Sequence, residues 1–188
     1  MVAKCSSSMT IRAATAEDLP ALRALLRENE CLLTLGAERG NEAMRRMGQK
    51  YVESVCGSEL KDWDSCAAVY AKGASTLWVL ESDGRIRGSV GVLDDGGESV
   101  ELVRMYTDRT VRRRGLGRRL LDHLLAHARS ACPAARSVWL STPTANTPGL
   151  EFYEAVGFAV EEDFTPPGGW APELRRFRRR LEPSYCCS

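Results

Sequence analysis

The sequence has 188 residues, 44% of them hydrophobic and 27% charged, with a formal net charge of +1. These values favour one globular domain with a sizeable core, and they exclude a protein that binds nucleic acid or an anionic membrane through its overall charge. No apolar run approaches the roughly 18 residues that a membrane span needs. We expect a single domain over residues 9–182, with a disordered tail at 1–8 and a second tail at 183–188.

The first half of the domain predicts a strand, two helices and then three strands. Residues 9–14 alternate apolar and polar side chains, which is typical of a short strand. Thr15 follows as a helix N-cap, and leucines beyond it line one face of a first helix. A second helix is expected over residues 38–55, whereas residues 56–74 show no regular period. Turn residues separate the three predicted strands, at 75–81, 85–93 and 99–107.

The second half predicts alternating helices and strands. Leucines recur on one face of a long helix over residues 114–129. Shorter elements follow: a strand at 137–141, a helix at 148–156, a strand at 157–160 and an arginine-rich edge strand at 174–181. The strands at 99–107 and 137–141 flank the long helix, so they form a parallel pair within an otherwise antiparallel sheet. The fold class is therefore α/β of the α+β type, with a mixed, mostly antiparallel central sheet.

A glycine loop lies between the strand at 99–107 and the long helix. Residues 112–117 read Arg-Arg-Arg-Gly-Leu-Gly, and Arg118 and Arg119 follow. Unpartnered N–H groups and the helix dipole favour an anion at a helix start, and glycines let it approach, so we expect phosphate or pyrophosphate. The pattern of a P-loop is missing, and Leu120 stands where a dinucleotide-binding loop has its third glycine. A plain glycine turn with solvated arginines remains the alternative.

Two segments resemble the GNAT superfamily of acetyl-CoA-dependent N-acetyltransferases. Arg112, Gly115 and Gly117 match the family's Arg/Gln-x-x-Gly-x-Gly/Ala loop. Residues 146–158 are similar to its Asn-x-x-Ala-x-x-x-Tyr-x-x-x-Gly-Phe segment, with Gly149 in place of the usual alanine.

The resemblance extends over about residues 9–162 and implies the GNAT fold. In that fold helices cover both faces of a sheet that opens around acetyl-CoA, here between the strands at 99–107 and 137–141. The backbone amides of six consecutive residues would hold the pyrophosphate: Arg112, Arg113, Arg114, Gly115, Leu116 and Gly117. Three residues at the strand end would pair with the pantetheine amides, and a fourth would bind the same arm through its side chain: Met105, Tyr106, Thr107 and Asn146.

The resemblance also suggests an acid and a base for amine attack on a thioester. Tyr153 would protonate the leaving thiolate, because the reference pKa of a phenol, about 10, lies above that of a thiol, about 8.5. The alternative for Tyr153 is packing against Phe158. Glu101 matches the strand glutamate of histone-type enzymes and is expected to share a partly desolvated face with Val103 and Met105. The alternatives for Glu101 are a salt bridge with an arginine and, for the base itself, a chain of water molecules.

No metal site is expected from the sequence. His123 and His127 stand four residues apart on the long helix, but we expect them on its solvent side, and no nearby acidic or cysteine residues complete a set of ligands. The seven cysteines are scattered without a Cys-x-x-Cys pair, and the first residues include no apolar secretion signal. We expect reduced thiols, the exposed Cys186 and Cys187 among them, and a cytoplasmic protein.

The predicted function is transfer of the acetyl group of acetyl-CoA to a primary amine. The rivals are a basic nucleic-acid-binding module and a fold that binds CoA without catalysis. Six acidic residues near the expected acceptor region favour a cationic acceptor: Glu59, Asp62, Asp64, Glu161, Glu162 and Asp163. We expect a monomer or homodimer that binds neither nucleic acid nor membrane.

Overall fold

A computed structural model describes residues 9–35, 42–167 and 173–182. The two predicted tails lie outside these residues. The strands are β1 (Met9–Ala13), β2 (Thr76–Ser82), β3 (Arg85–Leu93), β4 (Ser99–Thr107), β5 (Ser137–Pro143), β6 (Ala159–Phe164) and β7 (Leu174–Arg180). The helices are α1 (Leu19–Leu35), α2 (Glu42–Gly57), α3 (Trp63–Val69), α4 (Leu116–Ala131) and α5 (Thr147–Ala155), with short 3-10 turns η1 (Ala16–Asp18) and η2 (Arg109–Val111).

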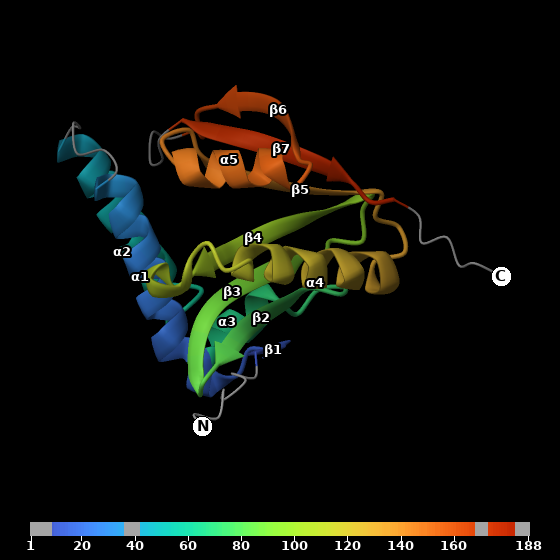
Figure 1. The fold of residues 1–188 in the computed structure, drawn as a ribbon, viewed down its shortest axis with the longest axis horizontal. Helices are drawn as coiled ribbons and strands as arrows, with labels where there is room; N and C mark the ends of the chain where they lie inside the picture. Colours follow the sequence, from blue (N-terminus) through green and yellow to red (C-terminus); the bar gives the residue numbers. More distant parts are fainter. Residues whose placement is uncertain (1–8, 36–41, 168–172, 183–188) are drawn as a thin grey trace, which may run out of the picture.

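The strands form one seven-stranded sheet in the order β1-β2-β3-β4-β5-β7-β6. All neighbouring strands are antiparallel except β4 and β5, which run parallel. This arrangement confirms the predicted fold class and places the parallel pair in the middle of the sheet (Figure 1).

Helices cover both faces of the sheet, as predicted. One core cluster joins α4 and α5 to β2–β5 and β7, and its centre is the leucine stripe of α4. The stripe residues are all buried: Leu116, Leu120, Leu121, Leu124, Leu125 and Ala128. A second cluster joins α1, α2 and α3 to the other face of β2. On that face, β5, β7 and β6 lack a covering helix among the described residues, as Figure 1 shows.

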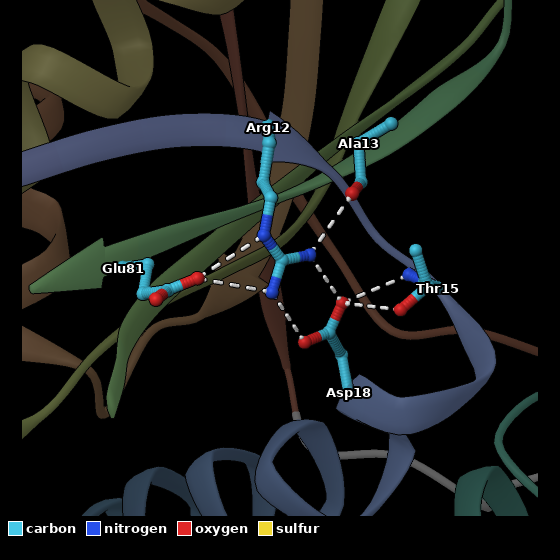
Figure 2. Close-up of polar contacts among 5 residues, drawn as sticks. All are labelled: Arg12, Ala13, Thr15, Asp18 and Glu81. Carbon is cyan, nitrogen blue, oxygen red and sulfur yellow. Dashed lines mark hydrogen bonds and ion pairs between the residues drawn. The ribbon is translucent and has the colours of Figure 1, made fainter. Parts of the chain in front are cut away.

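An ion-pair cluster ties the first strand to the first helix. Arg12 on β1 donates to both carboxylate oxygens of Asp18, at 2.7 and 2.9 Å, and also contacts Glu81 on β2. Asp18 accepts in turn from the backbone N–H and the hydroxyl of Thr15 (Figure 2). The Asp18 side chain is only 6% exposed, so its charge depends on these partners.

The Asp18 cluster predicts acid-sensitive stability. Hydrogen bonds from Arg12 and then from Thr15 hold the pKa of Asp18 below its usual value against the effect of burial. The carboxylate therefore stabilises the fold above the unfolded-state pKa of about 3.9, and this contribution disappears as pH falls through the lowered folded-state pKa. We expect Asp18→Asn to lower the free energy of unfolding by ~1–2 kcal/mol at pH 7.

Urea unfolding of both proteins at pH 7 and pH 3 measures this difference. The exposed neighbour Glu17 supplies the control, because Glu17→Gln removes the same charge and should change stability little. If Asp18→Asn and wild type differed in the free energy of unfolding by the same amount at pH 7 and at pH 3, the ionised Asp18 carboxylate would not be the source of the stabilisation.

The structure corrects two sequence predictions. Residues 56–74 were expected to be irregular, but α3 lies within them, and its N-cap Asp62 accepts from the backbone N–H of Ser65 at 2.8 Å. The strand at 174–181 was expected at an edge, but β7 lies between β5 and β6. Phe177 is the fully buried side chain of β7. The neighbouring arginines pair with acidic residues of β6, so an interior strand has the composition of an edge strand.

Candidate active site

β4 and β5 pair over only three residues and then separate. The pairs are Ser99 with Ser137, Val100 with Val138 and Glu101 with Trp139. β4 continues to Thr107 and β5 to Pro143, but within the described residues the register between the two strands ends at Glu101 and Trp139. In Figure 1 the two strands meet near the end of α4 and diverge toward its start. The predicted opening of the sheet is therefore confirmed.

A bulge interrupts β4 shortly after the strands separate. β4 has one more residue than β3 between the flanking pairs, which are Gly91–Val103 and Ser89–Tyr106. Arg104 and Met105 have no register partner on β3. Arg104 has φ of 51°, in the left-handed region that residues other than glycine seldom adopt. The backbone of β4 is thus locally irregular where the opening begins.

The bulge overturns one prediction about Glu101. An extra residue reverses the alternation of side chains beyond it. Met105 therefore packs in the core cluster around α4, whereas Tyr106 packs with the α1–α3 cluster. Val103 lies near Tyr70 on the α1–α3 side. Glu101 shares a face with Val103, as expected, but Met105 lies on the opposite one.

The glycine loop has the backbone of an anion-binding site. Arg113 and Gly115 both have positive φ, at 62° and 78°. None of the backbone N–H groups from Arg113 to Arg118 has a protein partner within the described residues. The next one, that of Arg119, donates to the Gly115 carbonyl at 3.0 Å. A Cβ atom added to Gly115 would have no atom within 4 Å, so the space beside these donors is open.

The loop is anchored to α1 by a residue that sequence analysis did not identify. Arg112 donates through Nη2 to Oδ1 of Asn29 at 2.6 Å. The Asn29 amide donates to the carbonyls of Leu25 on α1 and Thr107 at the end of β4. Asn29 and Arg112 stand 83 positions apart in the sequence, and no local pattern links them.

The remaining arginines of the loop divide into two groups. Arg119 turns toward the first strand and donates to the Met9 carbonyl at 3.4 Å. Arg113, Arg114 and Arg118 are exposed. Their positive charges belong to the same segment as the unpaired amides and add to the attraction of an anion.

The second glycine of the loop has a packing role. A Cβ atom on Gly117 would lie 3.3 Å from the Phe152 ring and 3.6 Å from the Met105 side chain. The start of α4, the strand β4 and the helix α5 therefore meet closely at Gly117. Glycine at this position permits that approach.

Asn146 is the N-cap of α5. Its Oδ1 accepts from the backbone N–H of Gly149 at 3.2 Å, and its Nδ2 donates to the hydroxyl of Thr142 at 2.9 Å. A Cβ atom on Gly149 would lie 2.2 Å from Nδ2, so alanine there would displace this side chain. The departure from the family pattern at Gly149 thus allows Asn146 to fold back onto the helix.

Tyr153 lies on the buried side of α5. Its ring contacts three others at centroid distances of 5.5 to 5.8 Å, which belong to Phe152, Phe158 and Phe177. Its hydroxyl makes no hydrogen bond with a described residue. Burial raises the pKa of Tyr153 well above its ordinary value, so the phenol keeps its proton at every physiological pH. The expected packing against Phe158 is present, together with a proton that the hydroxyl could donate.

Glu101 is half-buried on the face of β4 away from α4. Burial raises the pKa of this carboxyl, and the charges of Arg104 and Arg176 partly oppose the shift. Both arginines pair with other carboxylates, Arg104 with Glu59 and Arg176 with Glu162. Within the described residues Glu101 forms no ion pair, so it does not have the salt bridge that was its alternative role.

The acidic residues that suggested a cationic acceptor have partners within the protein. Asp62 caps α3. Four others pair with arginines, as Glu59–Arg104, Glu161–Arg178, Glu162–Arg176 and Asp163–Arg175. Asp64 alone lacks such a partner in the part of the chain that the structure describes, and it stands in the first turn of α3. These residues no longer argue for a cationic acceptor.

The two histidines do not face solvent alone, because both of their rings also pack against Trp78. Both rings meet the Trp78 ring edge-on, at 5.1 Å for His123 and 4.8 Å for His127. His127 also contacts the Ala74 carbonyl through Nε2 at 2.7 Å. Over residues 9–35, 42–167 and 173–182, no group of three or more metal-ligating side chains is found. No helix in these ranges combines the length and hydrophobicity needed to cross a membrane.

Known proteins show the same fold. The model of the acetyltransferase (GNAT) family matches residues 41–158, which is more than half of the chain. PaiA N-acetyltransferase from Thermoplasma acidophilum, solved with coenzyme A, is similar with a TM-score of 0.69 and 18% identity, over 92% of this chain and 99% of its own.

Two further solved structures share this fold. A GNAT-family acetyltransferase from Staphylococcus aureus Mu50 gives a TM-score of 0.64 at 16% identity, covering 93% of this chain and all of its own, 100%. YncA from Salmonella typhimurium, solved with its cofactor acetyl-CoA, gives a TM-score of 0.58 at 20% identity. The similarity covers 94% of this chain and 95% of YncA. No curated protein matches the sequence.

Proposed function

The chain belongs to the GNAT acetyltransferase family, and from this premise we propose that it transfers the acetyl group of acetyl-CoA to a primary amine by direct attack. The observation that carries the proposal is the run of unpaired backbone N–H groups from Arg113 to Arg118 at the start of α4. This run follows the end of β4, beside the opening between β4 and β5. Coenzyme A in PaiA and acetyl-CoA in YncA support the choice of ligand.

In this proposal the backbone amides of Arg113–Gly117 hold the pyrophosphate. The N–H of Arg112, the sixth expected donor, instead donates to the Arg109 carbonyl at 3.4 Å. The edge of β4 that faces the opening, at Met105, Tyr106 and Thr107, pairs with the pantetheine amides like an added strand. Asn146 contacts the same arm, and its amide would have to share or exchange its hydrogen bonds with Gly149 and Thr142 to do so.

The candidate acid and base lie on opposite faces of the sheet. Tyr153 belongs to the α4–α5 side, and Glu101 to the side of α1–α3. An acetyl group in the opening between β4 and β5 would therefore have a proton donor on one face and a carboxylate on the other. Glu101 would take a proton from the attacking amine, and Tyr153 would give one to the departing sulfur.

A primary amine is the acceptor class that this arrangement fits best. A half-buried carboxylate with a raised pKa suits proton removal from an ammonium group. The adjacent surface on β5 and β7 carries Trp139 and Arg176, whose guanidinium lies 5.4 Å from the Trp139 ring. This surface is a candidate for the rest of the acceptor.

A pair of isosteric variants at Gly115 tests the phosphate loop. Asparagine and aspartate both tolerate the left-handed conformation of Gly115 and differ in one charge. We expect Gly115→Asp to bind acetyl-CoA on the order of 10-fold more weakly than Gly115→Asn, because a carboxylate would repel the pyrophosphate at close range. Isothermal titration calorimetry measures both dissociation constants.

The difference in acetyl-CoA affinity between Gly115→Asp and Gly115→Asn should shrink as salt is added, since partly exposed charges are screened. Equal affinities of the two variants for acetyl-CoA at low salt would remove the pyrophosphate from this loop. Absence of binding by the wild-type protein would reject the proposed function as a whole.

A further inference from the structure

The segment that joins β4 to the glycine loop is fixed at its start by β3. Asp108, the first residue after β4, accepts from Nη1 of Arg87 at 2.5 Å, and its backbone N–H donates to the Arg87 carbonyl at 2.8 Å. Asp108 also caps η2 through the backbone N–H and the hydroxyl of Thr110, at 2.8 and 2.7 Å. The backbone therefore leaves the sheet in a defined direction.

The end of the same segment is fixed by α1 instead. Among the described residues the Arg112 side chain has one hydrogen-bond partner, Oδ1 of Asn29 at 2.6 Å. The Asn29 amide is itself held, because Nδ2 donates to the carbonyls of Leu25 at 2.8 Å and Thr107 at 3.4 Å. One side chain thus joins α1, the end of β4 and the residue that precedes the unpaired amides.

The loop has little other support before α4 begins. Arg113 and Arg114 are exposed, and neither side chain makes a hydrogen bond with a described residue. The space beside Gly115 is open. The position of the first unpaired amides therefore depends on where Arg112 is held. A shift of these donors would weaken their hydrogen bonds to a phosphate, which need a short distance and a favourable angle.

A neutral amide suits this position better than a carboxylate would. A carboxylate could also accept from the Arg112 guanidinium, but it could not donate to the carbonyls of Leu25 and Thr107. It would also bring a negative charge toward an anion-binding loop. Asn29 holds the guanidinium without cancelling its positive charge, and within the described residues Arg112 forms no ion pair.

We propose that Asn29 is a positioning residue, whose hydrogen bond with Arg112 holds the start of the glycine loop where its unpaired amides reach the pyrophosphate of acetyl-CoA. This inference rests on the proposed function. It also makes α1, which packs in the α1–α3 layer, a support for a site at the start of α4 on the opposite face of the sheet.

The test compares acetyl-CoA with its two halves. The nucleotide half, 3′-phospho-ADP, contains the pyrophosphate, whereas S-acetylpantetheine contains the thioester arm without a phosphate. Asn29→Leu removes the amide and keeps the size and the charge of the residue. We expect it to raise the dissociation constants for acetyl-CoA and 3′-phospho-ADP by about 3- to 10-fold, the range for one lost hydrogen bond, and to leave that for S-acetylpantetheine unchanged. Calorimetry with the full chain gives the constants, by competition for the weakest ligand.

A matched control comes from the same helix. Arg23 on α1 also donates to backbone carbonyls, those of Leu60 and Lys61 between α2 and α3. Arg23→Met removes these contacts without touching the loop, so all three constants should stay unchanged. Because Asn29→Leu alters no charge, its loss of affinity should persist as salt is added, unlike the loss in Gly115→Asp.

A double variant tests whether Asn29 acts through Arg112. Arg112→Met removes the donor of the hydrogen bond and, with it, one positive charge. Asn29→Leu/Arg112→Met should bind 3′-phospho-ADP no more weakly than Arg112→Met alone, because both changes break the same contact.

The outcomes separate the inference from the proposed function. Equal weakening of all three ligands would mean a general structural role and overturn the inference, as would unchanged affinities in folded Asn29→Leu or additive losses in the double variant. Each of these results would leave the proposed function standing, provided that the wild-type protein binds acetyl-CoA. Should Asn29→Leu fail to fold, Asn29→Ala, which removes the amide and suits a helix, is judged by the same results.

Discussion

Replacing Tyr153 by phenylalanine should lower turnover by about 10²-fold while acetyl-CoA still binds. The change keeps the ring and its contacts with Phe152, Phe158 and Phe177, so the fold should change little. The hydroxyl is lost, and with it the proton for the departing CoA sulfur. General acid catalysis contributes about 10²–10⁴-fold. The lower end applies because a thiolate, with a conjugate-acid pKa of about 8.5, is only a moderately poor leaving group.

Steady-state kinetics with an acceptor found by screening amines for thiol release provides the measurement. The apparent KM for acetyl-CoA should change little, because the hydroxyl acts on the leaving group rather than on the bound cofactor. Phe158→Leu is a control that alters the same aromatic cluster without touching a proton donor. Near-full turnover of Tyr153→Phe would make Tyr153 a packing residue and transfer the acid role to water or another group.

Turnover by the wild-type protein also decides between catalysis and mere binding of CoA. A protein that binds acetyl-CoA with the expected Gly115 dependence but releases no thiol with any amine would be a CoA-binding fold without catalysis. The positions of Glu101 and Tyr153, on the two faces beside the opening, favour catalysis.

Local sequence predicted the elements whose causes are local. The leucine stripe of α4 specified a helix and its buried face, and the turn residues before β3 and β4 specified their hairpins. The glycine loop was recognisable because positive φ and an uncapped helix start need particular residues at fixed spacing. The β-α-β order predicted the parallel pair, whereas the site of the sheet opening was implied only by the resemblance to the GNAT superfamily.

Features that depend on distant contacts were not predictable in this way. Residues 99–107 show no glycine or proline at which a bulge would be expected, and Arg104 is held there by Glu59, 45 positions away. The bulge in turn changed the face of Met105. Acidic residues were misread for a related reason, since their arginine partners on β7 follow from a strand order that composition does not reveal.

Glu101→Gln should reduce the rate by on the order of 10²-fold near neutral pH, with a dependence on pH that identifies a base. Burial raises the pKa of Glu101, so wild-type activity should fall as pH drops through a value above the ordinary 4.5 of this group. The variant has no carboxyl at this position, so its rate does not depend on the titration of Glu101. Its rate should rise with pH only as the amine loses its own proton, near pH 10 for an alkylamine. The ratio of the wild-type rate to the variant rate should therefore be largest at low pH and shrink as pH rises toward the pKa of the amine.

Stability measurements separate this effect from damage to the fold. Because the folded-state pKa of Glu101 is raised, its ionised form disfavours the folded protein above that pKa, and the penalty vanishes below the unfolded-state value of about 4.3. Glu101→Gln should therefore be at least as stable as wild type at pH 7 and lose any advantage in acid. Thermal unfolding at several pH values checks this. A small rate loss that is uniform across pH would remove Glu101 from the base role and leave a chain of water molecules to accept the proton.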